Sequence, residues 1–191
     1  MKGKTMKLYT VGYEGCDIEE FTTALKEAGV TQVADLRKNP VSRKRGFSKR
    51  LMGEALAEKK IEYLHLPGLG VPTEWRKLAK EELITRKKMF KDYVQKILPK
   101  AQEEIAVLQK LLKKKGLALL CYEADASDCH RHFVAEEMIR TTKGKIIIDN
   151  LQVRSDEPKL FNIRQLQART SKASSETAPT KSKLSKSRKR T

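Results

Sequence analysis

The chain has 191 residues, and its 41 Lys and Arg against 24 Asp and Glu give a formal net charge of +17 at neutral pH. No apolar run approaches the roughly 18 residues that span a bilayer, and the first residues lack the apolar core of a signal peptide. Because three cysteines in a large domain favour a reducing compartment over a disulfide framework, we expect a cytoplasmic protein with no membrane partner.

The positive charge belongs to two parts of the chain. Residues 169–191 hold eight Lys or Arg and one Glu, which leaves 33 basic and 23 acidic residues in residues 1–168. We predict an α/β domain over residues 6–153 and a basic tail over residues 154–191, disordered from about residue 169. A field of this sign attracts polyanions such as nucleic acid, although a solvated lysine-rich surface has the same composition.

The first elements form a strand, helix, strand unit. Residues 7–12 predict a strand, and residues 31–36 predict a second one. Between them, apolar residues recur at helical spacing over about residues 18–28, and Asp17 with Glu20 forms a capping-box pattern. Such a unit crosses over right-handed and lays its strands parallel.

A basic connection and a short third strand follow. Residues 37–50 contain Pro and Gly and cannot continue as strand, and Ser48 is placed to cap a short helix. Residues 61–64 predict the third strand, and residues 65–72 a loop with two prolines and two glycines.

The second half of the domain is helical and then returns to the sheet. Residues 74–115 predict two helices or one helix kinked at Pro99. Residues 117–121 predict a buried fourth strand, Asp128 is the expected N-cap of a helix that ends near residue 141, and residues 145–149 predict a fifth strand. The whole pattern indicates a three-layer α/β fold, with a mainly parallel sheet of about five strands and helices on both faces.

Polar and titratable side chains follow the predicted strands at their carboxyl ends. In an open parallel sheet, ligands bind in the crevice beyond these ends, so we expect the side chains to share a pocket. Surface loops are also polar in general, which is the simpler explanation. The residues concerned are Tyr13, Glu14, Asp35, Arg37, residues 65–70, Glu123, Cys129, His130 and Arg131.

The basic connection after the second strand has the composition of a phosphate site. Arginine forks bind phosphate, hydroxyl groups add contacts, and an aromatic ring can stack on an unpaired base. A helix N-terminus at Ser48 adds affinity for an anion, although a solvated basic loop fits the same residues. The candidate contacts to phosphate or base are Tyr13, Arg37, Ser42, Arg43, Phe47, Ser48, Lys49, His130 and Arg131.

Two kinds of sulfur chemistry fit residues 117–133. A metal could use Cys121, Cys129, His130 and His132, but the spacing matches no paired C-x-x-C site and the two histidines face different sides of a helix, so we expect no metal or cofactor. Cys129 near a helix N-terminus could instead act as a thiolate, whereas Cys121 on a strand is typical of a buried inert thiol.

Carboxylate chemistry is the third possibility. Glu123, Asp35 or Glu14 could act as a general base or activate water, while Arg131 and Arg37 neutralise a phosphate nearby. A buried salt-bridge network that joins the strand ends uses the same residues without catalysis.

Several motifs occur in a recognisable order: residues 10–15, residues 35–37 with Pro40 and Ser42-Arg43, residues 46–49, Tyr63 with Leu69-Gly70, residues 120–123 and residues 129–131. Together they resemble the domain of unknown function 488 family. The resemblance implies a compact α/β domain with these motifs near one another, and it implies no activity. A looser similarity to rhodanese-type domains lies in Cys121 at the end of a strand and Arg131 in the next helix.

These patterns predict a nucleic-acid-binding protein that hydrolyses a base, nucleotide or phosphodiester linkage, in the manner of a glycosylase or nuclease. The pocket would lie at the carboxyl ends of the strands, and DNA and RNA fit equally well. Two alternatives remain open, a DNA- or RNA-binding module without catalysis and a thiol-dependent, rhodanese-like transferase. The oligomeric state is not predicted.

Overall fold

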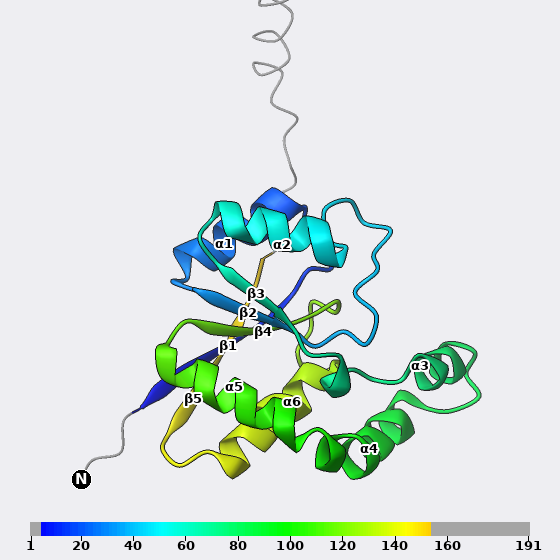
Figure 1. Cartoon of the computed structure of the whole chain (residues 1–191). Helices are drawn as coiled ribbons and strands as arrows, with labels where there is room; N and C mark the ends of the chain where they lie inside the picture. Colours follow the sequence, from blue (N-terminus) through cyan, green and yellow to red (C-terminus); the bar gives the residue numbers. More distant parts are fainter. Residues whose placement is uncertain (1–4, 154–191) are drawn as a thin grey trace, which may run out of the picture. The chain divides into compact units, whose positions relative to one another are not determined.

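A computed structural model of the chain describes residues 5–153. Within this range five strands form one sheet, in the order β3-β2-β4-β1-β5, and every pair of neighbouring strands is parallel (Figure 1). The parallel sheet of about five strands is therefore confirmed, while the predicted basic tail lies outside the described residues. The strands are β1 (Met6–Gly12), β2 (Gln32–Asp35), β3 (Glu62–His65), β4 (Leu117–Cys121) and β5 (Ile146–Leu151).

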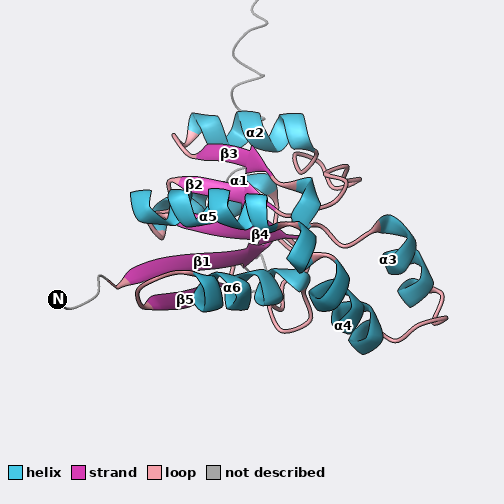
Figure 2. Ribbon diagram, turned by 60° about the horizontal axis from the view of Figure 1, so that its bottom comes forward, coloured by secondary structure: helices cyan, strands magenta, loops and turns pink. Residues whose placement is uncertain are grey.

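Helices cover both faces of the sheet, as the sequence predicts (Figures 1 and 2). Because side chains alternate along a strand, Val11 and Leu120 pack with Phe21 on one face, whereas Leu8 and Leu119 pack on the other. The first face carries α1 (Ile18–Glu27) and α2 (Lys49–Glu58), and the second carries α5 (Gln102–Lys114) and α6 (His130–Thr141). None of the helices between residues 5 and 153 has the length and apolar character that a membrane crossing requires.

The predicted helix starts are correct in two cases and wrong in one. Asp17 and Glu20 form the expected capping box of α1, and α2 begins directly after Ser48, although the Ser48 side chain makes no capping hydrogen bond. The N-cap of α6 is Cys129 and not Asp128. Asp128 instead accepts a hydrogen bond from Arg86 Nε at 2.7 Å, a contact between distant segments that the local pattern could not reveal.

The helical region before β4 has one more break than the sequence predicts. The chain is interrupted at residues 81–85, where Glu82 has a positive φ of 58°, and again at the 3-10 turn η2 (Leu98–Lys100), which contains Pro99. The expectation of two helices or one kinked helix is therefore wrong, because three helices form. Two of the three, α3 (Thr73–Lys80) and α4 (Arg86–Lys96), lie beyond the carboxyl end of the sheet (Figure 1).

The connections diverge at the carboxyl end of β4. This strand lies between β1 and β2, which lead to α1 and α2 on one face, whereas β4 itself leads to α6 on the opposite face. In open α/β sheets, such a switch in direction leaves a crevice where ligands bind. The residues that follow β4 are thus placed at the position where a site is expected.

Candidate functional site

A cleft of about 680 Å³ opens where the connections diverge. The end of β1, the loop after β2, the helices α3 and α4, and the segment after β4 all contribute to its walls. Among the described residues that line it, Glu123 is the one acidic side chain. Because all the other charged side chains of the cleft are cationic, the cleft attracts anions. The cationic side chains are Arg37, Lys38, Arg43, Lys44, Arg76, Lys80 and Arg86.

Glu123 carries a half-buried carboxylate next to two thiols. Its Oε2 accepts hydrogen bonds from Cys121 Sγ at 3.0 Å and from Cys129 Sγ at 3.1 Å. Burial raises the pKa of Glu123, but the hydrogen bond from Cys121, together with further bonds from the backbone and from Cys129, lowers it more, so the pKa lies below its ordinary value. The carboxylate is therefore ionised at neutral pH.

The backbone of Glu123 is held from three sides. Arg131, 1% exposed, donates from Nη1 to the Glu123 carbonyl at 2.6 Å and from Nη2 to the Ala124 carbonyl at 2.9 Å. The Ala124 N–H donates to Glu14 Oε2 at 3.0 Å, and a Cβ at Gly12 would overlap the Glu123 carbonyl oxygen. Glu14 and Arg131, predicted as a catalytic and a phosphate-binding residue, therefore position the segment that carries Glu123.

Asp35 and Arg37 form a buried ion pair at the end of β2. Asp35 is 0% and Arg37 6% exposed, and Arg37 Nη2 lies 2.6 Å from Asp35 Oδ2, which also accepts a hydrogen bond from the Tyr63 hydroxyl at 2.6 Å. Burial lowers the pKa of Arg37, but the hydrogen bond and charge of Asp35 raise the pKa by a larger amount. The pKa of Arg37 therefore lies above its ordinary value. The structure thus places both residues in the buried network that the sequence offered as an alternative to catalysis.

The aromatic residues predicted to stack on a base pack against each other instead. The rings of Tyr13 and Phe47 are stacked with centroids 4.4 Å apart and are 3% and 0% exposed. Arg37 Nη1 donates to the Tyr13 hydroxyl at 2.9 Å and to the Phe47 carbonyl at 2.8 Å, which fixes this arrangement. The exposed aromatic ring in the cleft is that of Tyr122, which is 46% exposed and which the sequence reasoning did not select.

Only some of the residues that were predicted as phosphate contacts in the basic connection line the cleft. Ser42 and Arg43 line it, whereas Ser48 and Lys49 do not. The Lys49 N–H donates to the Pro40 carbonyl at 2.9 Å, so this position supports the loop through its backbone.

Helix α3 supplies cations that sequence reasoning missed. Arg76 and Lys80 are four residues apart and both line the cleft, so they lie on one face of α3. Arg86 at the start of α4 joins them. No local pattern distinguishes these cations from others in the helical region, because their place on this wall depends on how α3 and α4 pack beyond the sheet.

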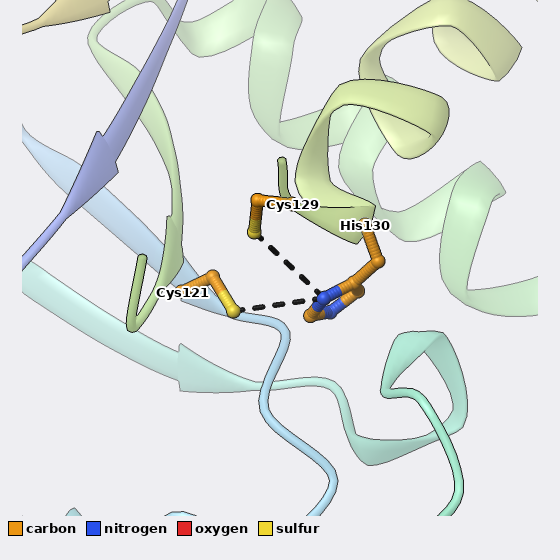
Figure 3. A group of neighbouring side chains, drawn as sticks. All are labelled: Cys121, Cys129 and His130. Carbon is orange, nitrogen blue, oxygen red and sulfur yellow. Dashed lines mark hydrogen bonds between the residues drawn. The ribbon is translucent and has the colours of Figure 1, made fainter. Parts of the chain in front are cut away.

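Cys121, Cys129 and His130 form a buried cluster (Figure 3), and two of them, Cys121 and His130, also line the cleft. His130 Nδ1 lies 3.6 Å from Cys121 Sγ and 3.9 Å from Cys129 Sγ, and His130 Nε2 lies 3.1 Å from the Leu36 carbonyl oxygen. His132, the fourth candidate for a metal ligand in the sequence, is not part of this group and pairs with Glu136 at 3.2 Å. Packing of α6 against the end of β4 therefore assembles three of the four candidates.

The expected activation of Cys129 as a thiolate is not found. Cys129 is 1% exposed, and it does not belong to the residues that line the cleft. Burial, followed by the contact with Cys121, raises the pKa of the Cys129 thiol well above its ordinary value. The thiol is therefore protonated at neutral pH, the opposite of what its place at a helix N-terminus predicts.

Comparison with known proteins gives a family and no activity. The sequence profile of a family described as "Domain of unknown function DUF488" matches residues 17–138. Neither the comparison with curated proteins nor the comparison with solved structures returned a match. The matched segment covers more than half of the chain, including the ion pair of Asp35 and Arg37 and the cluster around Glu123. The chain therefore belongs to the domain of unknown function 488 family.

Proposed function

We propose that this protein binds a nucleic acid or nucleotide by its phosphates in the cleft and hydrolyses the bond between sugar and base, with Glu123 as the catalytic carboxylate. The observation that carries the proposal is the charge pattern, in which one ionised carboxylate faces a cleft whose other charged side chains are Arg and Lys. The cations favour phosphate, and the carboxylate favours a reacting group that gains positive charge.

The position of the single carboxylate favours cleavage of an N-glycosidic bond over cleavage of a phosphodiester. Hydrolysis at a sugar carbon passes through an oxocarbenium-like state, which an anion stabilises. Phosphodiester hydrolysis concentrates negative charge, which Glu123 would repel. In the proposed reaction Glu123 accepts a proton from the attacking water, the new bond forms at the sugar carbon, and the base leaves with the electrons of the broken bond.

The surroundings of Glu123 fit this role. Tyr122 is exposed at the cleft and offers a ring on which a base can stack. Arg76, Lys80 and Arg43 are exposed cations on the walls, where they can reach phosphates on either side of the reacting nucleotide. A base would have to leave its stack to reach Glu123. Leaving the stack is easiest in single strands or at damaged base pairs.

The test is incubation of the full chain with labelled single-stranded and duplex DNA and RNA, with damaged bases included, and with mononucleotides. Release of free base, with an abasic site that alkali cleaves, supports the proposal if Glu123→Gln abolishes it. Strand cleavage without base release would contradict the proposed reaction and would indicate a nuclease. Binding without any product, at every pH and with every metal tested, would overturn the proposed catalysis and would indicate a nucleic-acid-binding module without catalysis.

A further inference from the structure

The cluster of Cys121, Cys129 and His130 has the spacing of a metal site. One ligand atom from each residue lies within 4.8 Å of the other two. In tetrahedral coordination, zinc bonds of about 2.3 Å to sulfur and about 2.0–2.1 Å to nitrogen place these atoms about 3.6 Å apart. The distances from His130 Nδ1 to the sulfurs are 3.6 and 3.9 Å, so the nitrogen already lies near the expected distance from both sulfurs (Figure 3).

The second nitrogen of His130 is engaged as it is in metal-binding histidines. The Leu36 carbonyl can only accept a hydrogen bond, so the proton of the neutral ring stays on Nε2, 3.1 Å away. The lone pair of Nδ1 then points at the two sulfurs. Leu36 is itself tied to β4, because its N–H donates to the Leu120 carbonyl at 3.0 Å. A backbone carbonyl that orients the imidazole in this way is one of the common partners of a metal-ligating histidine.

Charge and access are also suitable for a soft divalent cation. Two thiolates neutralise a divalent ion, and binding of the ion replaces the hydrogen bonds that both thiols donate to Glu123. Thiolate and imidazole ligands select zinc over magnesium or calcium. Cys121 and His130 line the cleft, so an ion can reach the cluster from solvent.

We propose that Cys121 Sγ, Cys129 Sγ and His130 Nδ1 bind one Zn²⁺, with a fourth coordination position on the side of the cleft. Binding forms two Zn–S bonds and one Zn–N bond, breaks two S–H bonds and releases two protons to solvent. Three protein ligands with an open fourth position are the pattern of catalytic zinc sites. The proposal goes beyond the hydrolysis proposed above and does not depend on it.

The experiment is a Zn²⁺ titration of the full chain, reduced and freed of metal by chelation, followed by calorimetry and elemental analysis. We expect one Zn²⁺ per chain. Cys121→Ser, Cys129→Ser and His130→Ala should each lower the affinity by at least about 100-fold, beyond the 10- to 100-fold typical of partners outside the ligand set. Cys16→Ser and His132→Ala are matched controls that should keep it, because Cys16 packs near Tyr13 and His132 pairs with Glu136.

Co²⁺ bound to the unaltered chain gives an independent readout that no folding defect in a variant can imitate. Thiolate-to-cobalt charge-transfer bands, together with the strong visible bands of tetrahedral Co²⁺, support the site. Absence of stoichiometric Zn²⁺ binding, Co²⁺ spectra without charge transfer, or full affinity in both cysteine variants would overturn it. Since no substrate is used, a negative result here leaves hydrolysis by Glu123 unaffected, and loss of hydrolysis leaves the metal site unaffected.

Discussion

Arg131 donates a hydrogen bond of 2.6 Å to the carbonyl oxygen of Glu123, so a buried arginine of α6 fixes the backbone of the acidic residue in the cleft. Its other terminal nitrogen holds the Ala124 carbonyl. Arg131 does not line the cleft, and with its guanidinium bound to these two carbonyls it is not available to a phosphate. The two contacts also connect the stability of the fold to the position of Glu123.

Arg131→Met should therefore lower the free energy of unfolding. The substitution keeps much of the side-chain volume but leaves the partly buried Glu123 and Ala124 carbonyls without their donor, at a cost of up to about 1–3 kcal/mol for each acceptor. Urea denaturation measures the change. Unaltered stability in Arg131→Met would contradict the role of this residue as a support.

Glu123→Gln should abolish hydrolysis while binding persists. The substitution keeps the size of the side chain and removes the base, whose contribution is about 100- to 10,000-fold in rate. Asp125→Asn is the matched control, since Asp125 is an exposed acid two residues away that does not line the cleft. Equal rates for the wild type and Glu123→Gln in a base-release assay would exclude the carboxylate mechanism.

Arg76→Ala with Lys80→Ala should weaken nucleic-acid binding and its dependence on salt. The slope of log affinity against log salt should fall by about 0.9 for each duplex phosphate contact that is lost. Lys110→Ala with Lys114→Ala removes the same charge at the same spacing from α5, away from the cleft, and should have a smaller effect. Similar losses in both double variants, measured by fluorescence anisotropy, would mean that net charge and not the cleft governs binding.

The pKa of Glu123 predicts a specific dependence of stability on pH. Because this pKa is below its ordinary value in the folded protein, ionised Glu123 stabilises the fold above the unfolded pKa of about 4.3, and this contribution is lost as pH falls through the folded pKa. The difference in unfolding free energy between wild type and Glu123→Gln should be constant near neutral pH and shrink in acid. If this difference in unfolding free energy grew as the pH fell, it would contradict a lowered pKa for Glu123 in the folded protein.

Asp35→Asn should destabilise the protein by about 3–5 kcal/mol, because it leaves the Arg37 guanidinium buried without its counter-charge. Thermal unfolding of Asp35→Asn, Arg37→Gln and the double variant forms a double-mutant cycle. We expect the double variant to lose less than the sum of the single losses. Additive losses would show that the two side chains do not act as a pair.

The fold could be predicted from local sequence because its signals are local. The strand β4 is an apolar run, and the capping box of Asp17 and Glu20 is complete within four residues. The break at residues 81–85 escaped prediction, and so did Arg76 on the cleft wall, because both depend on how α3 and α4 pack beyond the sheet.

The sequence predicted where the cleft lies, but only some of the residues that line it. The carboxyl ends of the strands do converge, and Glu123 lies in the cleft as expected. The burial of Arg37 and Arg131 depends on partners distant in the chain, such as Tyr13 for Arg37 and Thr10 for Arg131. Spacing alone also argued against a metal, because it could not show that β4 and α6 bring Cys121 and His130 together.

The most direct test of the central claim is a titration of the isotopically labelled full chain with a short single-stranded oligonucleotide, followed by NMR of assigned backbone amides. We expect saturable shifts at Tyr122, Glu123, Arg76 and Lys80, which are brought together only by the cleft. Shifts confined to residues 154–191, or spread over exposed lysines such as Lys110 with no change at Glu123, would contradict this claim.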